Sequence, residues 1–117
     1  MNSRSLGSLG ESLAEEFIAD LGWDIIGRNC HYRFGEVDIL ADDGSTVIII
    51  EVKAKTSSQF GEAVEMITAG KKRVLIRLAK LIQSQYNRPV RIDVIAINNF
   101  GTPTVQVAHY PGAIDTV

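Results

Sequence analysis

Two acidic residues and a lysine could form a reactive site at the end of an apolar segment. Four apolar residues, Val47–Ile50, are followed by Glu51 and, two positions later, by Lys53. Residues two apart in a β-strand point to the same side of the sheet, so these two side chains should project together. A turn predicted at residues 42–45 would fold the preceding segment back and bring Asp38 opposite residue 51, within two positions. The sequence therefore predicts two carboxylates and one ammonium group at the rim of a buried sheet.

This set of groups suits metal-dependent phosphate chemistry. Carboxylate oxygens are ligands that Mg²⁺ prefers, and this ion keeps several waters and shares phosphate oxygens with a substrate. The metal can activate water, and a nearby lysine can orient that water and neutralise charge on the phosphate. A structural explanation stays open, in which Glu51 and Lys53 form a surface ion pair and Asp38 is a hairpin charge. The Glu-x-Lys triplet alone is a weak motif.

Length and composition narrow the class of protein. The chain has 117 residues, of which 45% are apolar and 22% charged, so we expect one globular domain spanning residues 1–117. The longest apolar runs have four residues, so we expect no membrane-spanning helix, no signal peptide and a cytoplasmic location. One cysteine and two histidines cannot build a Cys/His zinc cluster. The net charge of −2 gives no support for nucleic-acid binding by itself.

Periodicity and turn residues predict the elements that position the acidic residues. A first helix ending at Gly22 would place five apolar side chains on one face, namely Leu6, Leu9, Leu13, Phe17 and Leu21. Strands are predicted at residues 36–41 and 46–55, joined by the turn at 42–45, with a shorter strand around 24–29.

The second half of the chain should contain one helix and two strands. Thr68 is a good N-cap for a helix that runs to about residue 85. Strands are predicted at residues 90–97 and 105–109. The resulting order, αβββαββ, indicates an α/β or α+β fold.

The second helix carries several basic residues. Lys71 aligns with the apolar stripe and lies near the helix N-terminus, where a cation is disfavoured, so it is a candidate phosphate contact. Its alternative role is a lysine whose stem packs while its amine reaches solvent. Arg73, Arg77 and Lys80 lie on the opposite face, which we interpret as a solvated face or a track for a DNA backbone directed away from the acidic residues. The aromatic residues form no regular stacking platform, and His109 is predicted to be structural.

Several short motifs in this order resemble those of the YraN family. These are Gly10-Glu11, Arg28-Asn29, Gly35-Glu36-Val37-Asp38-Ile39, Glu51-Val52-Lys53, Phe60-Gly61, Thr68 with Lys71, and Arg91-Ile92-Asp93-Val94. The family comprises small bacterial proteins similar to Holliday-junction resolvases, within the PD-(D/E)XK nuclease superfamily. The resemblance extends from about residue 6 to residue 109, and the pairing of GEVD with EVK is its specific part. It implies a restriction-endonuclease-like αβββαβ core with a mixed central sheet flanked by helices.

The resemblance also implies roles for individual residues. Asp38 and Glu51 match the metal-binding acids, the carbonyl of Val52 would be a further ligand, and Lys53 would be the catalytic lysine. Glu11 matches the acidic residue of the first helix that completes the metal shell directly or through water. Alternatively, Glu11 belongs to a capping box that starts at Ser8 and only caps its own helix.

The implied activity is a Mg²⁺-dependent endonuclease acting on DNA, with Mn²⁺ as a second candidate metal and branched DNA as a candidate substrate. Lys71 and Lys55 would contact phosphate, and a homodimer is consistent with resolvases of this superfamily. Lys55 and His31 stand where the family usually has arginine. Lysine keeps the charge but loses the bidentate fork that suits phosphate, and histidine makes a phosphate contact there pH-dependent or absent. The alternative is a non-catalytic module of the same fold that binds nucleic acid or a protein partner. A purely structural or assembly protein would bind neither metal nor DNA.

Overall fold

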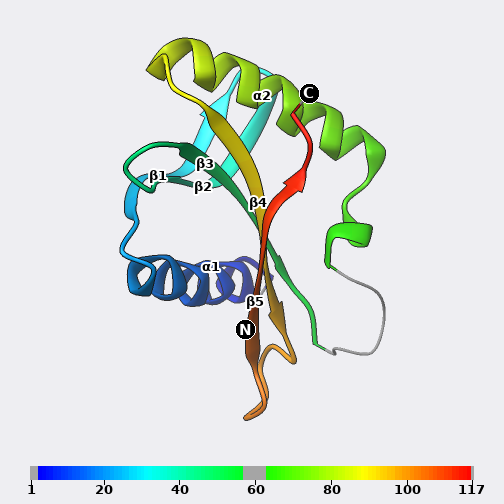
Figure 1. The fold of residues 1–117 in the computed structure, drawn as a ribbon. Helices are drawn as coiled ribbons and strands as arrows, with labels where there is room; N and C mark the ends of the chain where they lie inside the picture. The colour runs from blue at the N-terminus through cyan, green and yellow to red at the C-terminus, as the bar shows by residue number, and fades with distance from the viewer. Residues whose placement is uncertain (1–2, 57–62, 117) are drawn as a thin grey trace.

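The fold is a five-stranded sheet with one helix on each face (Figure 1). The computed structural model describes residues 3–56 and 63–116, and Phe60-Gly61 of the quoted motifs lies outside them. The elements in chain order are α1 (Ser3–Asp20), β1 (Asp24–Tyr32), β2 (Gly35–Asp42), β3 (Val47–Ala54), the short 3₁₀ helix η1 (Ala63–Met66), α2 (Ala69–Tyr86), β4 (Val90–Asn98) and β5 (Gln106–Ile114).

The sheet is mixed, as predicted. Its strand order is β1-β2-β3-β4-β5, with β3 and β4 parallel and every other neighbouring pair antiparallel. The connection between the parallel strands β3 and β4 contains α2. Parallel neighbours need such a crossover, because the chain must return to the end of the sheet where the first strand began. The predicted αβββαβ core with helices on the sheet is therefore confirmed, and β5 is added at one edge.

Helix α2 follows the sequence prediction closely. Thr68 caps the helix, since its side-chain oxygen accepts a hydrogen bond of 3.1 Å from the amide of Lys71. Leu75, Leu78 and Ile82 are fully buried against one face of the sheet. The helix ends at Tyr86 and is followed by Asn87 in the left-handed conformation that commonly terminates helices.

Helix α1 buries a face that is rotated from the predicted one, and of the predicted side chains Leu13 and Phe17 still pack partly against the core. Leu9 and Leu21 are 46% and 43% exposed, whereas Ala14 and Ile18 are fully buried. Gly10 is also buried, and a Cβ there would lie 3.4 Å from that of Ala54. Small residues at four-residue spacing let the helix approach the sheet closely, and this close approach decides the orientation of the helix over the leucine pattern.

Two strands are longer than predicted. Strand β1 continues past residue 29 to Tyr32, although Asn29 has a positive φ of 47°. Strand β5 continues past His109 to Ile114 and includes Pro111. Proline is tolerated there because β5 lies at the edge of the sheet.

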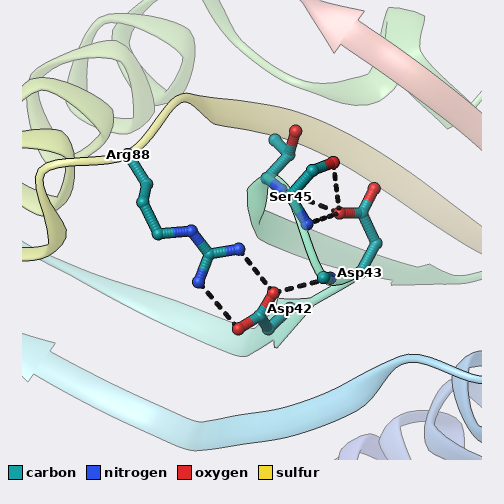
Figure 2. Close-up of polar contacts among 6 residues, drawn as sticks. Asp42, Asp43, Ser45 and Arg88 are labelled. Atoms are coloured by element: carbon teal, nitrogen blue, oxygen red, sulfur yellow. Dashed lines mark hydrogen bonds and ion pairs between the residues drawn. The ribbon is translucent and has the colours of Figure 1, made fainter.

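The turn between β2 and β3 is held by two aspartates (Figure 2). Asp43 Oδ1 accepts hydrogen bonds from the amides of Ser45 and Thr46, at 2.9 and 2.8 Å. The Asp42 carboxylate accepts two bonds from the Arg88 guanidinium, at 2.6 and 2.8 Å, which ties the hairpin to the segment before β4. These contacts fix the register of the hairpin, in which Asp42 pairs with Val47.

None of the helices in the described part of the chain combines the length and the hydropathy that a membrane span requires.

Candidate active site

The acidic residues meet where the pairing of β2 with β3 stops. The last pair in the register is Ile39 with Ile50. Asp38 of β2 and Glu51 of β3 are the residues that come directly after this pair on their two strands. Beyond this point the Asp38 carboxylate takes the place of a strand partner, since its Oδ2 accepts a hydrogen bond of 3.0 Å from the amide of Val52. The hairpin therefore brings the two predicted carboxylates together.

Glu51 is the most buried group of the site. The residue is 4% exposed, and Lys53 Nζ lies 3.9 Å from its Oε1 while Lys71 Nζ lies 3.8 Å from its Oε2. Both distances are too long for a hydrogen bond, and Glu51 Oε2 has no hydrogen-bond partner. Burial raises the pKa of Glu51 to about 7, and the charge of Asp38 adds to this effect, against the two lysines.

Asp38 is held between opposing influences. Burial raises its pKa, whereas the hydrogen bond from the Val52 amide and the charge of Lys71 lower it. The charge of Glu36 raises it further. Sequence reasoning assigned no role to Glu36, yet its charge also raises the pKa of Glu51, and its position two residues before Asp38 on the same strand was the available signal.

Glu11, on α1, lies within electrostatic reach of Asp38. Burial and the charge of Asp38 both raise its pKa, while a hydrogen bond with the Asn29 side chain lowers it. The capping-box alternative is wrong, because α1 begins at Ser3 and residue 8 lies inside the helix. The partnership with Asn29 was not predicted, and it gives the Arg28-Asn29 motif a place beside the site.

Only some of the basic residues predicted for the site lie beside the acidic residues. Lys53 and Lys71 both approach Glu51, and the Lys71 side chain is 34% exposed, so its amine lies at the border between the core and solvent. Lys55 lies just past β3, where its amide donates to Ile97 and its carbonyl accepts from Phe100. His31 is exposed on β1, and its Nδ1 lies 3.4 Å from Oε2 of the half-exposed Glu36, so its nearest charged neighbour is an acid.

The donor set of the site fits a hard divalent cation with water completing its shell. Within residues 3–56 and 63–116 no three His, Cys, Asp or Glu side chains lie close enough to hold a metal by themselves. The two carboxylates of Asp38 and Glu51, one of them with an unpartnered buried oxygen, are instead the incomplete set that Mg²⁺ accepts, because this ion keeps several waters. The site also lies toward the carboxyl ends of parallel strands β3 and β4, the edge where α/β sheets commonly bind ligands.

A second buried carboxylate lies on the neighbouring strand, where Asp93 pairs with Ile50, the residue before Glu51. Asp93 of β4 is fully buried and accepts hydrogen bonds from Arg91, His109 and the amide of Gly112. Its charge is therefore matched by a complete set of donors, in contrast to Glu51.

Comparison with known proteins identifies one family. The model of Uncharacterised protein family UPF0102 matches residues 10–97. A UPF0102 protein of Caldicellulosiruptor saccharolyticus is 41% identical over 100 residues, covering 83% of this chain and 85% of the relative. A UPF0102 protein of Geobacter metallireducens is 38% identical over 120 residues, covering 98% and 96%. The resemblance to the YraN family, which is UPF0102, is confirmed.

Proposed function

Because the chain belongs to Uncharacterised protein family UPF0102, whose name carries no activity, we propose its function from the site: a Mg²⁺-dependent endonuclease that hydrolyses DNA phosphodiester bonds, with branched or structured DNA among its substrates. The observation that carries the proposal is the buried Glu51 carboxylate, with one oxygen unpartnered, next to Asp38. A buried ionised group without a hydrogen bond is costly, and a divalent cation would remove that cost.

Each residue of the site has a role in this proposal. Asp38, Glu51 and the carbonyl of Val52 would hold the ion, with Mn²⁺ as an alternative to Mg²⁺, and Glu11 would assist directly or through water. When bound, the ion activates a water molecule and stabilises charge on the phosphate. Lys53, whose Nζ lies 3.9 Å from Glu51 Oε1, would orient the attacking water.

The substrate phosphate needs positive charge near the two acids. Lys71 supplies it from the first turn of α2, 3.8 Å from Glu51 Oε2. Lys55, just past the end of β3, supplies a second phosphate contact along the strand.

A second candidate is a non-catalytic module of the same fold that binds nucleic acid or a protein partner. The small number of acidic ligands favours this candidate. Among the described residues no three His, Cys, Asp or Glu side chains are grouped closely enough to hold a metal, so the site offers only a pair of carboxylates. Such a module would not need Asp38 or Glu51 for binding.

Calorimetric titration of Mg²⁺ and Mn²⁺ into wild type and Asp38→Asn tests the proposal. Asparagine keeps the shape of the side chain and an oxygen for the Val52 amide, but it removes the charge. The control is Asp20→Asn, which removes the same charge from the exposed end of α1. We expect metal affinity to fall at least about tenfold in Asp38→Asn and to be unchanged in the control.

The same three proteins are then incubated with labelled four-way-junction DNA and with linear duplex. Metal-dependent cleavage that is lost only in Asp38→Asn supports the nuclease. Metal binding without cleavage of either DNA keeps the metal site and counts against these two DNAs as substrates. A wild type that binds neither metal, with or without DNA, overturns the metal-dependent proposal.

A further inference from the structure

A basic hollow lies beside the first turns of α2, outside the acidic site. It has a volume of about 350 Å³ and is lined by Phe34, which follows β1, and by four residues of α2, namely Gly70, Arg73, Val74 and Arg77. This size is within the range of pockets that bind small ligands. The hollow combines an aromatic ring with two guanidinium groups, a chemistry that suits nucleotides.

Phe34 holds Arg77 in a defined position. The guanidinium carbon of Arg77 lies 4.0 Å from the centroid of the Phe34 ring, and the ring itself packs partly against the core beneath α2. The start of β2 approaches α2 so closely that a Cβ on Gly35 would lie 2.5 Å from Val74 Cγ1. This close approach places the Phe34 ring under Arg77, so the guanidinium group has the ring on one side while the Arg77 side chain stays exposed to solvent.

The two arginines of the hollow differ from other arginines of the chain in their partners. Arg28, Arg88 and Arg91 each form an ion pair with a carboxylate. No carboxylate in residues 3–56 and 63–116 lies within ion-pair distance of Arg73 or Arg77, and both side chains are exposed. Their charges are therefore available to an anion from solution.

The hollow and the acidic site share one helix. Lys71, which reaches Glu51, and Arg77 are six residues apart on α2, an axial separation of about 9 Å. Around the helix the two residues are about 120° apart, so a strand that contacts both must bend round the exposed side of α2.

We propose that this hollow binds an unpaired nucleotide of a nucleic-acid strand, with the base stacked on the open face of the Arg77 guanidinium and a phosphate paired with Arg73. An unpaired nucleotide fits because bases inside a duplex are covered on both faces by their neighbours, whereas a splayed base can stack on an arginine plane. The inference rests on the proposed function for its choice of a nucleic acid, and it assigns to that function a substrate with single-stranded character next to the cleavage site.

Fluorescence anisotropy of a labelled oligothymidine, in buffer with EDTA and low salt, tests the hollow independently of metal. Arg77→Ala should weaken binding at least about fivefold. Lys80→Ala is the matched control, because it removes one positive charge from an exposed position of the same helix outside the hollow. Arg77→Lys keeps the positive charge but loses the planar guanidinium group on which a base would stack, so it should also weaken binding. Phe34→Leu removes the aromatic ring under Arg77 and should weaken binding as well.

Equal losses in Arg77→Ala and Lys80→Ala would mean diffuse attraction and would overturn the proposal. So would wild-type affinity in Arg77→Lys, or a wild type that does not bind the oligothymidine. Binding that depends on Arg77 in a protein that binds no metal would keep the hollow and reject the nuclease. Metal-dependent cleavage with unchanged oligothymidine affinity in Arg77→Ala would keep the nuclease and reject the hollow. Circular dichroism confirms that each variant is folded.

Discussion

The amide of Val52 donates a hydrogen bond of 3.0 Å to Asp38 Oδ2 at the point where the pairing of β2 with β3 stops. A backbone donor of the central strand thus fixes a side chain of its neighbour. Because the donor is the residue that follows Glu51, this bond holds the two carboxylates close together. Their electrostatic repulsion is therefore built into the folded state. The raised pKa of each carboxyl group is the consequence that experiments can follow.

Glu51 should titrate near neutral pH in the metal-free protein. Burial and the charge of Asp38 raise its pKa to about 7, so NMR of ¹³C-labelled glutamate side chains should show one carboxyl group with a midpoint there. Asp38→Asn should lower this midpoint because it removes the neighbouring negative charge, whereas Asp20→Asn should leave it unchanged. A wild-type midpoint at the ordinary value of 4.5 would contradict the burial described here.

The same group should make stability depend on pH. The folded state binds the Glu51 proton more tightly than the unfolded chain, so this contribution to stability is full below about pH 4.5 and is lost as the pH rises through about 7. Glu51→Gln should therefore be more stable than wild type by about 2–3 kcal/mol near pH 8 and equally stable near pH 4. Urea unfolding at both pH values measures this, and a constant difference would count against it.

The pair of Asp42 and Arg88 should act in the opposite pH range. The Arg88 guanidinium holds the pKa of Asp42 at about 2, below its ordinary value of 3.8. The resulting stability is present above about pH 3.8 and is lost as the pH falls through about 2. Arg88→Ala should raise the Asp42 pKa toward 3.8, and it should make the free energy of unfolding depend less on pH in this range. Arg33→Ala should do neither. An Asp42 midpoint that Arg88→Ala does not move would reject the pairing.

Local patterns in the sequence were sufficient to predict that Asp38 and Glu51 lie together. An apolar run followed by Glu51, a turn made of Asp and Gly residues, and a carboxylate on the returning strand define a hairpin register from neighbouring residues alone. Thr68 likewise marked the start of α2 by its capping chemistry. These features depend on contacts between residues close in the sequence.

Features that depend on contacts between distant segments were not predictable in the same way. The buried face of α1 is chosen by how closely Gly10 and Ala14 approach the sheet, which a leucine pattern does not encode. The place of Phe34 under Arg77 depends on how a strand turn packs against a helix about forty residues later. The partnership of Asp93 with His109 needs the register of β5, an edge strand whose length proline obscured.

The corrected orientation of α1 can be tested with two substitutions. Ala14→Leu adds volume to a fully buried position and should cost about 1–3 kcal/mol of unfolding free energy. Leu9→Ala removes a larger side chain from a position that is 46% exposed and should cost less than about 0.5–1 kcal/mol. Urea denaturation of both variants gives the comparison, and the reverse order would restore the leucine face as the buried one.

Asp93 should be the carboxylate on which stability depends most. Its two oxygens accept four hydrogen bonds, from Arg91 Nε and Nη2, His109 Nε2 and the Gly112 amide, at 2.7–2.9 Å. Asp93→Asn would turn an NH₂ group toward these donors and leave the partly buried Arg91 without its counter-charge, so we expect a loss of about 3 kcal/mol or more. Asp24→Asn, at an exposed position of β1, should change the unfolding free energy by less than about 0.5 kcal/mol. Urea unfolding near neutral pH measures both, and a similarly small loss in Asp93→Asn would mean that the network contributes little. Since both Asp93 oxygens are occupied by their own donors, a folded Asp93→Asn protein should still bind Mg²⁺ as wild type does, which separates stability from function.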